Sequence, residues 1–192
     1  MTTTKLYKVL DEDGRAFHGG NGVWSLPIGK KKGAWMPPVK GELVLCENGY
    51  HLCRRQDLIR WLGPVIYVAE VRGRTIPDDT NVVAREARLV RRLDTWNETT
   101  ARLFAADCAE HVIGNIKDAQ IKLAAVKAIE AARAFARSEI DDAALSAAWS
   151  AASSAAWSAA ESAARSAAEA ARSMARSWQT DRLFAYLEGR RK

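Results

Sequence analysis

The sequence predicts an α+β protein, in which a small mixed domain at residues 1–96 precedes an alanine-rich helical bundle at residues 97–192. All five prolines and ten of the twelve glycines lie before residue 97, so turns must be frequent there. Residues 146–169 instead repeat a four-residue unit six times: SAAW, SAAS, SAAW, SAAE, SAAR and SAAE. Because alanine is the strongest helix former, this tract is predicted to be helical.

The first domain contains several candidate strands. Leu6–Leu10 predicts a short strand that ends at the turn Asp11–Gly14. A second strand is predicted at Val44–Cys46. Val65–Val71 is β-branched and almost continuously apolar, which is typical of a central strand. Val82–Leu93 is compatible either with a pair of strands or with a strand that leads into a helix.

One helix is predicted within the first domain, at Gln56–Leu62, where Gly63 and Pro64 end it. Among the aromatic residues of this domain, Tyr7, Trp61 and Tyr67 are expected in the core.

Helices dominate the second half. Thr99–Val112 has apolar residues at helical spacing, follows N-cap candidates at residues 94–97, and ends at Gly114. Ile121–Ala136 predicts a second helix. Asp141 and Asp142 can cap the alanine-rich tract, where the helix dipole favours negative charge.

A single helix from Asp142 to Glu188 would be about 70 Å long, at about 1.5 Å per residue. The neighbouring helices could not cover that length. We therefore predict a break either at Ser153–Ser154 or near Ser173–Trp178. The last segment, Thr180–Leu187, is expected to pack into the core.

The formal charge of +6 is concentrated in the first half, which has 16 Lys and Arg against 11 Asp and Glu. Such a surface could bind an acidic protein or nucleic acid, although a solvated basic face that binds nothing is the simpler interpretation. The two tryptophans that lie among Gly, Pro and Lys could add surface contacts. The candidate partner-binding residues are thus Trp24, Trp35, Lys30, Lys31, Lys32, Arg54, Arg55, Arg88, Arg91 and Arg92.

Compartment and metal chemistry follow from the apolar runs and the cysteines. The amino terminus lacks the apolar core of a signal peptide, and no stretch approaches the about 20 apolar residues that span a bilayer. Three cysteines, an odd number, favour free thiols in a reducing cytoplasm. Cys46 and Cys53 are too far apart for a zinc knuckle, even with His51 between them and the Cys108/His111 pair elsewhere, so no metal is expected.

The second half combines the alanine tetrads with four short segments: Cys108–Glu110, Ile129–Arg133, Ala136–Arg137 and Trp178–Gln179. In these features it resembles the alanine-rich, immunity-protein-5-like family of bacteria and phages, over about residues 101–189. It implies a protein that binds and neutralises another protein. It assigns no catalytic residues.

The first half resembles a bacterial and phage domain that has a C-x-x-GYH-L-C element, here Cys46–Cys53, followed by a strand. Its order of elements is also loosely similar to the ADP-ribosyltransferase fold. That similarity implies a site for NAD formed by Tyr50, His51, a carboxylate at Glu86 and Lys8, which stands where those enzymes place Arg or His.

Three functions are therefore considered. The first is a non-enzymatic cytoplasmic binding protein of the immunity or phage-inhibitor (anti-defence) type, without cofactor, acting as a monomer or weak homodimer. Its α+β head would bind a protein partner, and its helices would form a rigid scaffold. The alternatives are an ADP-ribosyltransferase-like enzyme that uses NAD, and a nucleic-acid-binding module that uses the basic first half.

Overall fold

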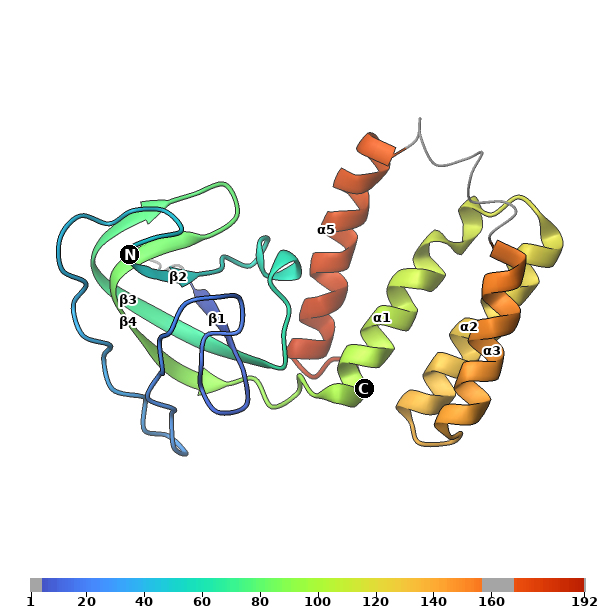
Figure 1. The fold of residues 1–192 in the computed structure, drawn as a ribbon, viewed down its shortest axis with the longest axis horizontal. Helices are drawn as coiled ribbons and strands as arrows, with labels where there is room; N and C mark the ends of the chain where they lie inside the picture. Colours follow the sequence, from blue (N-terminus) through green and yellow to red (C-terminus); the bar gives the residue numbers. More distant parts are fainter. Residues whose placement is uncertain (1–4, 157–167, 192) are drawn as a thin grey trace. The chain divides into compact units, whose positions relative to one another are not determined.

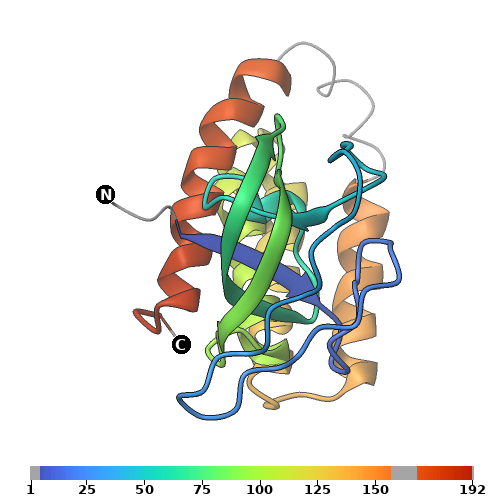
Figure 2. The same ribbon diagram turned by 90° about the vertical axis from the view of Figure 1, so that its left-hand side faces the viewer.

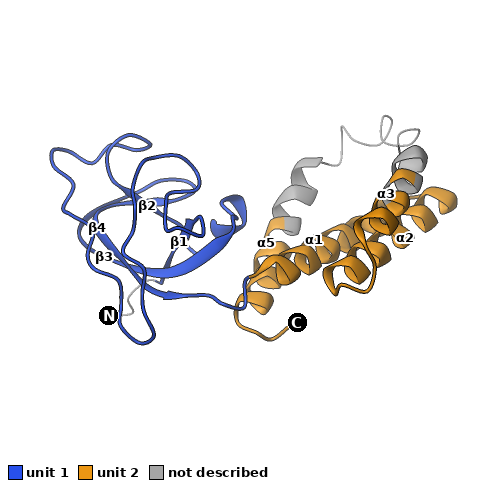
Figure 3. Cartoon of the chain, turned by 60° about the horizontal axis from the view of Figure 1, so that its bottom comes forward, with its two compact units in different colours: residues 1–96 blue, residues 97–192 orange. Residues whose placement is uncertain are grey.

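The computed structural model describes residues 5–156 and 168–191. The chain divides into two compact units, residues 1–96 and 97–192 (Figures 1 and 3). The first unit holds a four-stranded antiparallel sheet, and the described part of the second holds four α-helices. The predicted α+β fold class is confirmed. None of the described helices is both long enough and apolar enough to cross a membrane.

The sheet has the strand order β1-β3-β4-β2, with every neighbouring pair antiparallel. Its strands are β1 (Leu6–Leu10), β2 (Tyr50–Leu52), β3 (Val65–Pro77) and β4 (Val82–Arg92). Figure 2 shows β3 and β4 as a long twisted ribbon that β1 crosses at a steep angle. Two shifts of register between β3 and β4 mark irregularities of the kind that curl a sheet.

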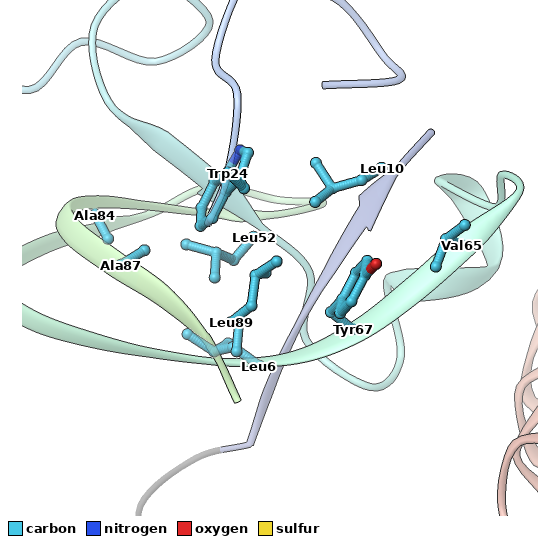
Figure 4. Close-up of a cluster of buried hydrophobic side chains, with 10 residues drawn as sticks. Leu6, Leu10, Trp24, Leu52, Val65, Tyr67, Ala84, Ala87 and Leu89 are labelled. Atoms are coloured by element: carbon cyan, nitrogen blue, oxygen red, sulfur yellow. The ribbon is translucent and has the colours of Figure 1, made fainter. Parts of the chain in front are cut away.

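The curled sheet comes close to closing on itself. The N–H of Tyr7 on β1 donates to the carbonyl of Cys53, just after β2, at 2.9 Å, and the N–H of Cys53 donates back to Tyr7 at 2.8 Å. One face of every strand consequently turns towards a common interior (Figure 4). The buried cluster there comprises Leu6, Leu10, Trp24, Leu52, Val65, Tyr67, Ala69, Ala84, Ala87 and Leu89.

Residues 33–39, here called the edge segment, pair with the part of β4 that β2 does not reach. The N–H groups of Gly33, Met36 and Val39 donate to carbonyls of β4 at 3.0, 2.9 and 3.0 Å. The edge of β4 is therefore covered along most of its length, although the edge segment forms no regular strand.

Several predictions for the first unit need correction. Residues 44–46 form a turn, with Cys46 at a φ of 63°, and the strand begins only at Tyr50. The side-chain amide of Asn48 donates to the carbonyls of Lys40 and Glu42 at 2.9 and 2.6 Å, which explains why this stretch folds back.

Two element lengths also differ from expectation. The predicted helix at Gln56–Leu62 is only one 3₁₀ turn, η1 (Leu58–Arg60), whereas the strand predicted at Val65–Val71 continues to Pro77. Residues 82–92 form one uninterrupted strand. The core positions of Tyr7 and Tyr67 are confirmed, but Trp61 is only half-buried.

The first two helices of the second unit begin at well-formed caps. In α1 (Glu98–Val112), the side chain of Asn97 accepts from the N–H of Thr100 at 3.1 Å, and the Thr100 hydroxyl accepts from the N–H of Asn97 at 3.0 Å. In α2 (Ala119–Ala136), the carboxylate of Asp118 accepts from the N–H groups of Gln120 and Ile121. Both predicted helices are confirmed, and a 3₁₀ turn, η2 (Ile113–Asn115), follows α1.

The alanine-rich part contains α3 (Asp142–Ala156) and α5 (Ala168–Leu187). The Asp141 carboxylate accepts from the N–H of Ala144 at 2.9 Å at the start of α3. Both predicted breaks are wrong, because Ser153–Ser154 lies inside α3 and Ser173–Trp178 lies inside α5. Serine costs a helix only a few tenths of a kcal/mol relative to alanine, roughly, so paired serines do not stop it. Trp157, with the rest of 157–167, and the Trp149 side chain lie outside the described part.

Within the second unit, α1 packs against α2 and α5, and α2 packs against α3 (Figure 3). The predicted core residues near the end of α5, Leu183, Phe184 and Leu187, are all buried. The ring of Phe104 on α1 meets that of Tyr186 on α5 edge-on, at a centroid distance of 6.3 Å. These aromatic and aliphatic contacts form the core between α1 and α5.

Replacing Gly33 tests how closely the edge segment approaches the backbone of Ser25. A Cβ at this position would lie 2.0 Å from the carbonyl oxygen of Ser25, so the backbone must move. We expect Gly33→Ala to lower the free energy of unfolding by about 2–3 kcal/mol in urea titrations. Gly22→Ala is the matched control, because its Cβ would meet Trp24 only at 3.6 Å, and it should change the same quantity by less than about 1 kcal/mol. Equal effects would contradict the packing described here.

Candidate functional site

Lys8 and His51, two residues of the transferase hypothesis, meet through the backbone of β2. The ammonium of Lys8 donates to the carbonyl oxygen of His51 at 3.0 Å. The imidazole of His51 accepts at Nε2 from the N–H of Cys46 at 3.0 Å. Burial, together with the nearby charge of Lys8, lowers the pKa of His51 and so favours this neutral acceptor. The ring thereby supports the turn at Cys46.

Tyr50 and Glu86, the other two residues of that hypothesis, also bind within the fold. The Tyr50 hydroxyl donates to the carbonyl of Pro37 in the edge segment at 2.8 Å. The Glu86 carboxylate accepts from Nε of Arg72 at 2.8 Å, across the β3–β4 ribbon. The four side chains thus bind four different groups of the protein. Each of these contacts joins two segments of the first unit.

Trp24 is a core residue, and the expectation that it lies on the surface is wrong. Only 4% of it is exposed. Its ring meets Tyr50 edge-on at 5.5 Å, and Lys8 Nζ lies 5.3 Å from the ring centroid. The glycine-rich segment that carries Trp24 folds over the sheet, so this indole fills the interior instead of facing solvent (Figure 4).

Trp35 is half-buried in a cluster on the outer face of the β3–β4 ribbon. The guanidinium carbons of Arg72 and Arg88 lie 4.4 and 4.5 Å from the ring centroid. Arg88 forms an ion pair with Glu70, which also pairs with Lys32 at 2.9 Å. This Trp35 cluster fastens the edge segment to the sheet through cation–π and ionic contacts. The ring is therefore already engaged by two cations.

Two more of the candidate partner-binding arginines are used within the fold. Arg54 forms an ion pair with Asp57 and donates to the carbonyl of Asp78 at 2.7 Å. Arg92 lies 3.3 Å from the carboxylate of Glu12 and 3.5 Å from that of Asp94. The sequence places these arginines in a basic half, but it does not show which acidic residues fold back onto them.

The remaining candidates are exposed. Residues 26–31, here called the exposed turn, reverse direction through two backbone hydrogen bonds of 2.9 Å between Ile28 and Lys31. Ile28 is 79% exposed. Lys30 and Lys31 are also exposed, and neither forms an ion pair with the described residues. Arg55 and Arg91 are exposed elsewhere in the unit.

The long loop-rich region before β2 also exposes apolar side chains. The most exposed large apolar residues described in the first unit belong to it: Phe17, Val23, Leu26, Ile28, Val44 and Leu45. Interaction surfaces combine such apolar groups with charged residues at their margins. The loop-rich region is therefore the candidate protein interface, with the exposed turn as its most accessible part.

The cysteines are free thiols, and no group of three or more His, Cys, Asp and Glu side chains suited to a metal ion occurs among the described residues. Burial raises the pKa of Cys53 to about 12 and that of Cys108 to about 11. Both thiols are consequently protonated and weakly nucleophilic near neutral pH.

The second unit contains a buried ionic cluster that the sequence analysis did not predict. Asp107 on α1 is only 2% exposed. Its carboxylate accepts from the hydroxyl of Tyr186 at 2.6 Å and from Arg133 at 2.7 Å, while Arg182 and Arg191 approach to 2.9 and 3.3 Å. These residues form the Asp107 cluster.

A signal for this cluster was present in the sequence. Asp107 follows Leu103 by four positions and Phe104 by three, so it lies on the apolar face of its helix. An acid at such a position requires buried partners. The sequence could have predicted a buried ion pair there, but it did not identify the arginines.

The surroundings of Asp107 keep it ionised. Burial alone would raise its pKa, but the hydrogen bonds from Tyr186 and Arg133 and the charges of Arg182 and Arg191 lower it below the usual value. Burial and the Asp107 carboxylate together raise the pKa of Tyr186 to about 12. The cluster therefore links α1, α2, α5 and the residues after α5 through one buried charge.

No protein-family model, curated protein or solved structure matches this chain in the three comparisons. The two family resemblances in the sequence therefore stay predictions. The function must be inferred from the described residues.

Asp107→Asn tests the ionic cluster. It leaves three arginines without their shared carboxylate, so we expect the free energy of unfolding of the full chain to fall by about 3–5 kcal/mol at neutral pH. Because the pKa of Asp107 is lowered in the folded state, its stabilisation is fully present above the unfolded pKa and is lost as pH falls through the folded pKa. Urea titrations at several pH values should therefore show that the free energy of unfolding of the variant falls less steeply at acidic pH than that of the wild type.

Glu110→Gln serves as the control for this prediction. Glu110 pairs with Arg133 at 2.7 Å but is largely exposed, so the loss should be under about 1 kcal/mol. Two variants that unfold equally easily would show that burial of Asp107 has no special role.

Proposed function

We propose that this chain is a non-enzymatic binding protein of the immunity or phage-inhibitor type, which neutralises a protein partner through its first unit. The observation that supports this most strongly is the exposed turn, where a 79% exposed Ile28 lies beside two lysines that form no ion pair with the described residues. The helices of the second unit serve as scaffold.

The chemistry of the exposed turn fits a protein surface with acidic and apolar groups. An exposed isoleucine gains free energy when a partner removes it from water. The lysines attract carboxylates over several ångströms, which speeds the encounter and discriminates between partners. The backbone bonds between Ile28 and Lys31 hold the turn in advance, so that less conformational entropy is lost on binding.

The contacts of the other candidate residues support binding in preference to catalysis. Lys8, Tyr50, His51 and Glu86 each bind a partner within the fold, and Trp35 is covered by two guanidinium groups. The NAD-dependent and nucleic-acid-binding alternatives therefore stay predictions without a specific observation in their favour. The free cysteines fit action in a reducing cytoplasm.

A pair of matched triple variants tests the proposal. The first changes the exposed turn, with Ile28→Asp, Lys30→Glu and Lys31→Glu. The second makes the same kinds of change at the exposed positions Lys122, Leu123 and Lys127 of α2, with glutamate for lysine and aspartate for leucine. Tagged wild-type chain is used to capture proteins from a bacterial lysate, and the captured proteins are quantified by mass spectrometry.

We expect at least one captured protein whose recovery falls ten-fold or more with the first variant and stays unchanged with the second. Circular dichroism checks that both variants fold. The proposal is wrong if no protein is recovered above background, or if the two variants reduce recovery equally.

A further inference from the structure

Lys8 occupies an interior position in the curled sheet. Side chains alternate along β1, and Leu6 and Leu10 both point into the interior (Figure 4). Lys8 lies midway between them and therefore shares their face. Its ammonium is found beside the indole of Trp24, one of the ten buried residues of the core cluster.

The ammonium of Lys8 has no counter-ion within the described part of the chain. Its hydrogen bond goes to a neutral carbonyl, that of His51, and no described carboxylate lies within 4.0 Å. The titratable groups close to it are the imidazole of His51 and the thiol of Cys53, and burial keeps that thiol protonated. A cation that is partly withdrawn from water and has no counter-ion lowers stability, so such a residue suggests a role beyond packing.

We propose that Lys8 is a nucleophilic amine that takes small carbonyl compounds, aldehydes or ketones, as covalent ligands through a Schiff base. The lone pair of Nζ adds to the carbonyl carbon, and a proton moves from nitrogen to oxygen to give a carbinolamine. A proton from solvent then adds to the carbinolamine oxygen, water leaves, and the product is a protonated imine. No oxidant, reductant or further group is consumed.

Three features of the surroundings favour this reaction. Burial lowers the pKa of Lys8 to about 8, so about one tenth of it is the neutral nucleophile at pH 7, against about 1 in 2,500 for an ordinary lysine. The face of Trp24 stabilises a cationic imine as it does the ammonium. Lys8 also stays partly exposed, which gives small reactants access. This role is independent of the proposed protein interface.

The test compares Lys8 with Lys5, an exposed lysine three positions earlier in the chain. Wild-type protein is incubated at pH 7 with glycolaldehyde and cyanoborohydride, which reduces each imine to a stable amine. Peptide mass spectrometry then measures the initial rate at each lysine. We expect labelling of Lys8 to be ten-fold or more faster than that of Lys5, and we expect this preference to disappear in concentrated urea.

Equal or slower labelling of Lys8 in the folded protein would overturn the proposal. A preference for Lys8 that persists in urea would also overturn it, because the fold would then not be the cause. Since only the wild-type chain is needed, the result does not depend on whether a variant folds.

Discussion

The first unit depends on the pairing of Tyr7 with Cys53, because these two backbone hydrogen bonds bring β1 against the chain that follows β2. An open four-stranded sheet would leave one face in water. A curled sheet whose ends meet instead has an interior, and the side chains of that face become its core. Trp24 fills this interior from a loop, and Lys8 donates to β2 inside it.

Asp107 and Lys8 are charged groups of the two units that lie beside core residues, and their charges are compensated differently. Asp107 is surrounded by Tyr186 and three arginines, so its charge is compensated and fastens helices together. Among the described residues, Lys8 meets a carbonyl oxygen and an aromatic face. A compensated charge stabilises a single arrangement of its neighbours, whereas an uncompensated one shifts towards its neutral form, which is the chemically reactive one.

Several basic residues of the first half are used within the fold. Arg54, Arg88 and Arg92 pair with acids, and Lys32 pairs with Glu70. Among the candidate partner-binding residues, Lys30 and Lys31 lie together at the exposed turn, while Arg55 and Arg91 are exposed elsewhere. Net charge alone therefore overestimates the number of basic side chains available to a partner. A side chain that is paired within the fold must break that pair before it can bind another molecule.

Features that depend on neighbouring residues could be predicted from the sequence. These are the strand at Leu6–Leu10, a helix cap within residues 94–97 and another at residues 141–142, the helices that follow them, and the α+β class as a whole. Hydrophobic periodicity and capping act over a few residues, so they can be read along the chain.

Which polar and aromatic side chains are covered became clear from the folded chain. Trp24 looked exposed because glycine and proline surround it, yet its loop folds over the sheet. Asp107 is separated from Tyr186 by 79 positions, and the acids that engage Arg54 and Arg92 could not be chosen among the many present. Burial and ion pairing depend on which distant segments meet, and that depends on the closure of the sheet and the packing of the helices rather than on local sequence.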